Sequence, residues 1–145
     1  MIHLSMHGNE TGIYLTDGKF VSWRHLRHEL LPVMRAVNGT LLFCISFCVS
    51  YAGVQMAMNS DDEPSFWALV GYTGAASWSD AAIAFSCFYY LFFKNVDIDI
   101  CVNSIRIASG DSNFVFHLGE ETKLNWYSYL KEKGEAKIQS AINAP

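Results

Sequence analysis

The stretch TLLFCISF, residues 40–47, is the strongest strand signal in this chain, and it decides the fold. Its nearly continuous apolar run is typical of a strand in a parallel sheet that is covered on both faces. A polar loop over 60–64 follows, and the apolar stretch FWALVGY, residues 66–72, predicts a second buried strand. The sequence therefore predicts a sheet with at least two buried strands.

Upstream of residues 40–47, the sequence predicts a strand, a hairpin and a helix. The first strand covers residues 2–6. The segment GIYLTDGKFVSW, residues 12–23, has an Asp-Gly turn between two alternating arms, which indicates a hairpin. Ser22 is placed to cap a helix with apolar residues at helical spacing, and Pro32 is expected to kink or shorten that helix.

Downstream of residue 72, helical signals outnumber strand signals. Ser77 and Asp80 form a capping box, and Gly110 is a stop signal for a later helix. The predicted elements are a helix over about 78–93, a helix over 97–110, a strand over 113–118 and a polar helix over about 120–133, with a frayed tail at 134–145. Strands that alternate with helices predict an α/β sandwich with a mainly parallel sheet.

Composition limits the class of protein. The chain has 145 residues, 51% of them hydrophobic, which fits one domain over 1–145 with a real core. A net charge of −4 argues against a nucleic-acid partner. The run from Ala36 to Ser60 lacks charges and is long enough to cross a bilayer, but its polar residues favour a buried strand and a loop over a membrane segment.

The four cysteines lack metal-ligand spacing, and no signal peptide is recognisable, so we expect reduced thiols in a cytoplasmic protein. We predict neither a metal ion nor a cofactor. Cys44, Cys87 and Cys101 are interpreted as core residues. The remaining histidines are interpreted as structural or surface residues, namely His3, His25, His28 and His117.

Two chemically capable side chains follow predicted strands. His7 comes just after the strand at 2–6, and Cys48 comes just after the strand at 40–47. Functional groups of parallel sheets collect at the carboxyl ends of the strands, so we expect this pair at one edge. A thiolate is a nucleophile, and an imidazole activates it and protonates a leaving amine. Backbone N–H groups of Gly8 and Cys48 are candidates for an oxyanion hole.

These motifs resemble the caspase-like cysteine peptidases, closest to the bacterial branch with the CHAT domain. The resemblance rests on LSMHG at 4–8 and ISFCVS at 45–50, with the cysteine 41 residues after the histidine. The hairpin at 12–23 and the segment SWSDAAIAFSCFYYLFF at 77–93 also resemble that family, and the likeness covers residues 2 to about 108. It implies a caspase-like three-layer sandwich and a cytoplasmic peptidase that acts on a protein or peptide substrate, in some relatives within bacterial defence.

The resemblance assigns His7 as the catalytic base, Cys48 as the nucleophile and Gly8 to the oxyanion hole. Trp78 and Asp80 stand where the family often builds a substrate pocket, although Asp80 is already explained as a helix cap. Family members have two βα units before the histidine strand, which this sequence lacks. We therefore expect an upstream segment or a partner chain to complete the sheet edge. The alternative function is an inactive caspase-fold module for interaction or regulation.

Overall fold

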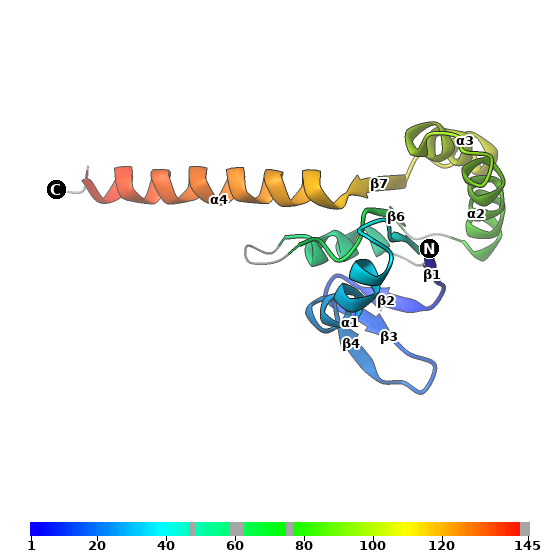
Figure 1. Ribbon diagram of the computed structural model, residues 1–145, viewed down its shortest axis with the longest axis horizontal. Helices are drawn as coiled ribbons and strands as arrows, with labels where there is room; N and C mark the ends of the chain where they lie inside the picture. The colour runs from blue at the N-terminus through cyan, green and yellow to red at the C-terminus, as the bar shows by residue number, and fades with distance from the viewer. Residues whose placement is uncertain (47–48, 59–62, 75–76, 143–145) are drawn as a thin grey trace.

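The computed structural model describes residues 1–46, 49–58, 63–74 and 77–142, and over 136–142 it describes the backbone alone (Figure 1). It is a mixed α/β structure. Its elements are β1 (Ile2–Leu4), β2 (His7–Asn9), β3 (Gly12–Tyr14), β4 (Phe20–Ser22), α1 (Trp23–Ala36), β5 (Leu42–Ile45), the 3₁₀ helix η1 (Ser50–Met56), β6 (Ala68–Tyr72), α2 (Trp78–Phe92), α3 (Ile98–Ser109), β7 (Phe114–Leu118) and α4 (Gly119–Ile142).

The main sheet has the strand order β1-β5-β6-β7. β5 is parallel to both β1 and β6, whereas β7 is antiparallel to β6. This confirms the prediction that the three strands 2–6, 40–47 and 66–72 are parallel neighbours. Every residue of β5 and β6 is buried, as expected for strands that helices cover on both faces.

A second, small sheet contains β2, β3 and β4 in that order, all antiparallel. The predicted hairpin at 12–23 is therefore confirmed, and it lies apart from the main sheet. The strand β2 was not predicted, because three residues that include a glycine carry no readable alternation. Its presence matters for the site, since β2 begins at His7.

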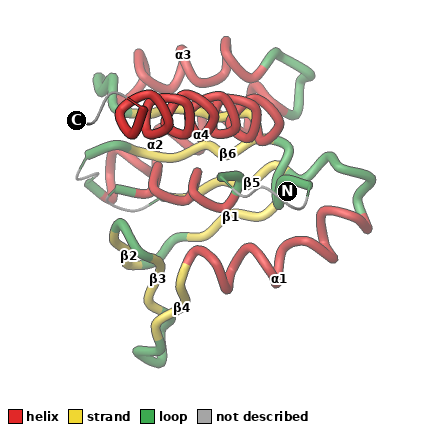
Figure 2. Tube along the Cα trace, turned by 90° about the vertical axis from the view of Figure 1, so that its left-hand side faces the viewer, coloured by secondary structure: helices red, strands yellow, loops and turns green. Residues whose placement is uncertain are grey.

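Helices form two outer layers around the main sheet (Figure 2). On one face, α1 and η1 pack against side chains such as Phe43, Ile45 and Leu69. On the other face, α2 and α3 pack against side chains such as Leu42, Cys44 and Val70. The odd-numbered residues of β5 thus point to the core under α1 and η1, and its even-numbered residues point to the core under α2 and α3. The result is an α/β/α sandwich of three layers.

Of the two effects expected from Pro32, a kink or a shortening, the helix α1 does not show the shortening. It runs from Trp23 to Ala36, and Ser22 caps it by accepting a hydrogen bond from the His25 N–H at 3.2 Å. Pro32 lies on the exposed face, while Leu31 and Met34 beside it are buried. Tertiary packing of the apolar face therefore outweighs the hydrogen bond that proline removes.

The helix α2 is exposed on one side, and the last helix is longer than predicted. The nearly all-apolar helix α2 is buried along one face only, and Ile83, Tyr90 and Phe93 are exposed. The helix α4 continues to Ile142, so residues 134–142 are helical rather than frayed. Figure 1 shows α4 projecting away from the sheet and its covering helices.

The charge-free run over 36–60 contains β5 and η1 rather than a long helix. Among the helices that the structure describes, none combines the length and the apolar character needed to cross a membrane.

Candidate functional site

The parallel strands end together at one edge of the main sheet. Leu4 closes β1 opposite Ile45, which closes β5, and the ladder continues one step further, because the Ser46 N–H donates to the Leu4 carbonyl at 3.0 Å. β6 ends beside them at Tyr72. This carboxyl edge is where functional groups gather in parallel sheets.

His7, the predicted catalytic base, lies three residues beyond the end of β1. It opens β2 opposite Tyr14, and its side chain is exposed. Cys48, the predicted nucleophile, lies outside the residues that the structure describes, so the dyad stays a prediction. The structure does place residues near each member of the predicted dyad. Leu4 precedes His7, and Ser46 and Val49 lie on either side of Cys48 in the sequence.

Gly8, the predicted oxyanion-hole residue, is half-buried in β2 opposite Ile13. The Trp23 N–H donates to the Thr11 carbonyl at 3.2 Å, which fixes the alternation of the antiparallel ladder. By that alternation, Gly12 faces β2 with its polar groups, and the N–H of Gly8 points away from β3. The N–H of Gly8 is thus directed to the outer side of the small sheet.

A sharp turn connects the central strand β5 to η1. Val49 has left-handed backbone torsions, with φ of 58°, which is a strained conformation for a β-branched residue. Its N–H donates to the Gly74 carbonyl at 2.9 Å, which ties the turn to the segment that follows β6. Strained residues of this kind cluster at active sites, where the surrounding structure holds them in place.

Ser50 holds the ends of β5 and β6 at this turn. Its fully buried hydroxyl donates to the Ile45 carbonyl at 3.1 Å and accepts from the Tyr72 N–H at 2.7 Å. These two backbone groups lie at the ends of β5 and β6, beyond the last pair of the ladder between them. The Ser50 side chain therefore completes their hydrogen bonding in the core.

A cavity of about 270 Å³ opens beside this edge, on the face covered by α2. Its lining residues are His3, Ser5, Ser46, Trp78, Ala81, Ala82, Phe85, Ser86 and Tyr89. Of the two residues predicted for a substrate pocket, Trp78 is in this lining and Asp80 is not. The Asp80 N–H donates to the Ser77 hydroxyl at 3.1 Å, as the capping interpretation requires.

The cavity contains a hydrogen-bonded group that the sequence analysis did not identify. The His3 Nε2 atom lies 2.8 Å from the Ser46 hydroxyl, and its Nδ1 atom bonds to the Tyr89 hydroxyl. The ring also packs on Phe85, with centroids 4.6 Å apart. Burial lowers the pKa of His3, so the imidazole is neutral at pH 7. A spacing of two residues between His3 and Ser5 is the sequence signal that places both on one face of the strand.

Cys44 lies in the core beneath this group, as its apolar surroundings predicted. Burial raises the pKa of its thiol to about 12, although a hydrogen bond with Tyr89 opposes the shift. Burial also raises the pKa of Cys101. Neither thiol forms a thiolate readily at neutral pH, so neither is suited to act as a nucleophile.

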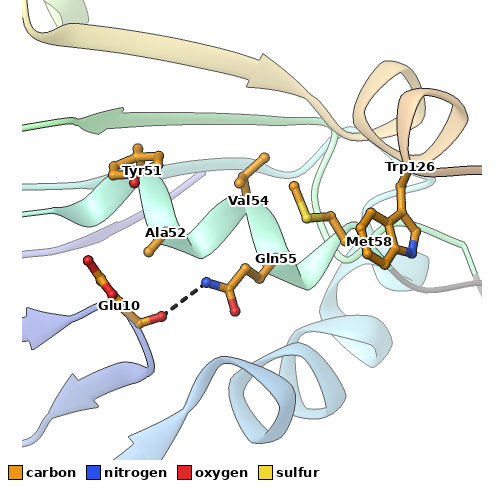
Figure 3. Close-up of a pocket in the computed structure, with 7 residues that line it drawn as sticks. All are labelled: Glu10, Tyr51, Ala52, Val54, Gln55, Met58 and Trp126. Carbon is orange, nitrogen blue, oxygen red and sulfur yellow. Dashed lines mark hydrogen bonds between the residues drawn. The ribbon is translucent and has the colours of Figure 1, made fainter. Parts of the chain in front are cut away.

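A larger cavity, of about 600 Å³, lies between the β2–β3 turn, η1 and α4 (Figure 3). Figure 3 shows Glu10 and Tyr51 toward one end and Met58 with Trp126 at the other. The Gln55 side chain donates to the Glu10 carbonyl at 3.0 Å. The Trp23 indole N–H donates to the same oxygen at 3.1 Å, so this carbonyl fastens the small sheet to the body.

No group of three or more His, Cys, Asp or Glu side chains in the described ranges is arranged to hold a metal ion. No protein-family model matches the chain, and no curated protein matches it.

Proposed function

We propose that the chain is a caspase-like cysteine endopeptidase, with His7 as base and Cys48 as nucleophile. The register of β1 against β5 is the observation that carries this proposal. Ile2 pairs with Phe43 and Leu4 with Ile45, and the members of each pair are 41 residues apart, as are His7 and Cys48. The offset of 41 residues between paired strand positions thus equals the separation of the two proposed residues in sequence, which supports their pairing.

The residues that precede the proposed dyad support the same assignment. Met6 packs on the α1 side of the sheet, whereas His3 contacts Phe85 of α2 on the other side. Ser5 and Ser46, each two residues before a member of the proposed dyad, line the cavity on the α2 side.

The proposed reaction has two halves, formation of a thioester and its hydrolysis, and His7 and Cys48 act in both. The His7 imidazole accepts the Cys48 thiol proton, and the thiolate attacks the carbonyl carbon of the scissile peptide bond. The resulting oxyanion accepts hydrogen bonds from the N–H groups of Gly8 and Cys48. The imidazolium then protonates the leaving amine, which leaves a thioester. His7 next deprotonates a water molecule, whose attack releases the acid and restores the thiol.

The test measures thiol reactivity and peptide hydrolysis on the same protein. We expect iodoacetamide to label Cys48 far faster than Cys44, Cys87 or Cys101, because a paired imidazole favours the thiolate. Cys48→Ala and His7→Ala should each lower kcat/KM for a peptide substrate at least about 100-fold, with the thermal midpoint nearly unchanged.

Two matched controls use the other cysteines. Cys87→Ala removes a half-buried thiol of α2 and should leave hydrolysis intact. Cys44→Ala removes a fully buried one and should lower the free energy of unfolding by about 1 kcal/mol while the folded fraction keeps its activity. Loss of activity in Cys44→Ala together with full activity in Cys48→Ala would show that the wrong cysteine was chosen.

An inactive interaction or regulatory module is the second candidate. Large apolar side chains on the outer surfaces of α2 and α3 favour it, since exposed apolar patches often bind other proteins. These exposed residues are Trp78, Ile83, Tyr90, Phe93, Ile100 and Ile107. Under this proposal, Cys48 should react with iodoacetamide no faster than the half-buried Cys87, and Cys48→Ala should leave the binding of a partner unchanged.

A further inference from the structure

The cavity of about 270 Å³ lies at the carboxyl edge of the sheet, beside the ends of β1 and β5. Ser5 and Ser46 line it, and each stands two residues before a member of the dyad. Residues of α2 bound the cavity, so it lies on the α2 side of the sheet, and this short separation in sequence places it near the proposed dyad. A side chain next to the bond being cleaved would enter this space.

Rings form the walls of the cavity. The lining includes the rings of His3, Trp78, Phe85 and Tyr89. His3 and Phe85 have centroids 4.6 Å apart, and those of Phe85 and Tyr89 are 6.0 Å apart, so three of the rings already make aromatic contacts. Such walls favour a further ring, because aromatic pairs gain energy beyond the area that they bury.

The cavity offers hydroxyl groups but no charge. Its lining contains Ser5, Ser46 and Ser86, and within the described part of the chain it includes no Asp, Glu, Lys or Arg. His3 adds no charge at pH 7, because its pKa is lowered by burial. A charged side chain would lose water here without gaining an ionic partner, which disfavours its entry.

Ser46 is the hydroxyl best placed to recognise a ligand. The Tyr89 hydroxyl is shared between His3 and the Cys44 thiol. The Ser46 hydroxyl bonds to His3 at 2.8 Å, which uses either its proton or one lone pair. A hydroxyl has one donor and two acceptor positions, so Ser46 keeps capacity for a second partner. A ligand hydroxyl matches it in either histidine tautomer, because a hydroxyl both donates and accepts.

We infer that this cavity binds the substrate side chain on the amino side of the scissile bond and selects an uncharged aromatic residue, with tyrosine preferred. Its volume suits one side chain rather than a larger ligand. The ring enters between Trp78 and Phe85, and the phenol hydroxyl reaches Ser46. The inference rests on the proposed peptidase function for its meaning, but binding can be tested without hydrolysis.

The first experiment compares fluorogenic peptides that differ only at the residue before the scissile bond. Tyrosine should exceed arginine and aspartate by about 100-fold in kcat/KM, and it should exceed phenylalanine by about 10-fold through the hydroxyl contact. Preference for a charged residue would overturn the pocket assignment while leaving the peptidase proposal intact. Absence of hydrolysis for every peptide would contradict the peptidase proposal. The NMR experiment below would then decide whether the cavity binds an aromatic side chain.

The second experiment measures binding to the full-length Cys48→Ala chain by NMR. N-acetyl-tyrosine amide should shift the His3 ring resonances with saturation, whereas N-acetyl-arginine amide should cause no saturable shift. Equal responses to both ligands, or no response to the tyrosine ligand, would overturn the inference.

Two variants separate recognition from folding. Ser46→Ala should reduce the preference for tyrosine over phenylalanine to about 1, a ratio that a general loss of stability does not change. Ala82→Leu fills the cavity from α2 and should weaken tyrosine-ligand binding at least 10-fold. Its matched control is Ala108→Leu, which adds the same atoms at an exposed position of α3 and should bind normally. Unchanged ligand binding in Ala82→Leu would contradict the assignment.

Discussion

At the scale of single residues, Ser50 is the buried polar group on which the candidate site depends most directly. Ser50→Ala would leave the Tyr72 N–H buried without its 2.7 Å acceptor. We expect the free energy of unfolding to fall by about 1–3 kcal/mol, because an unsatisfied buried donor carries its full desolvation cost. Urea denaturation measures this loss. The exposed Ser112→Ala is the control, and an equal small effect in both variants would show that Ser50 is not structural.

The two partly shielded histidines give a second prediction, in pH dependence. Burial lowers the pKa of both His3 and His117, while Glu121 opposes the shift at His117. Below the ordinary histidine pKa of about 6.5, the unfolded chain therefore binds protons that the folded chain does not. Stability should fall as the pH decreases from 7.5 to 5.5, with a slope below the limit of about 1.4 kcal/mol per pH unit for each proton.

Urea midpoints across that range test the prediction, with the double variant His3→Gln, His117→Gln as comparison. The variant should show a flatter dependence on pH. The lowered pKa values of Asp17 and Asp111 affect stability only in more acidic solution, so they do not contribute to the slope in this window. An equal slope in both proteins would rule out the histidines as its origin.

At the scale of elements, strong apolar runs and capping signals made the main strands and helices predictable. Residues 40–47 and 66–72 could be identified because complete burial imposes an apolar residue at every position. η1 was not predictable, since its seven residues contain a glycine and show no clear helical period. The hydrogen-bonded group of His3, Ser46 and Tyr89 was missed for another reason. Tyr89 is 86 residues from His3, and only the packing of α2 on the sheet brings them together.

The edge strand β1 gives a prediction for the whole element. The Leu4 carbonyl faces β5, so alternation directs the backbone polar groups of His3 and Ser5 away from the sheet. Open edges of this kind pair with other strands. We therefore expect the isolated chain to self-associate or aggregate in size-exclusion chromatography with light scattering, unless an upstream segment or a partner covers β1.

Ser5→Pro tests this edge, because it removes an outward N–H without removing a β1–β5 hydrogen bond, and Leu4 before it is already extended. Self-association should decrease in Ser5→Pro and persist in the matched control Ser5→Ala, which keeps the N–H. A monomeric wild-type chain with full peptidase activity would contradict the expectation that β1 needs a partner.

At the scale of the whole molecule, the antiparallel direction of β7 places the start of α4 at the opposite end of the sheet from the proposed site. β7 is antiparallel, so Leu118 lies beside Ala68 at the amino end of β6, and α4 starts there. The proposed site lies at the other end of the strands, beyond Ile45 and Tyr72. Figure 1 shows α4 leading outward from β7 and away from α2.

This placement makes the end of α4 a suitable point for immobilising the protein. A protein attached to a sensor surface or a bead through an anchor beyond Ile142 would present its carboxyl edge to the solution, since that edge lies across the sheet from the start of α4. The helix itself would act as a spacer of about 36 Å, from 24 residues at 1.5 Å each. Orientation of the carboxyl edge on a solid support would then require no engineering of the strands that build it.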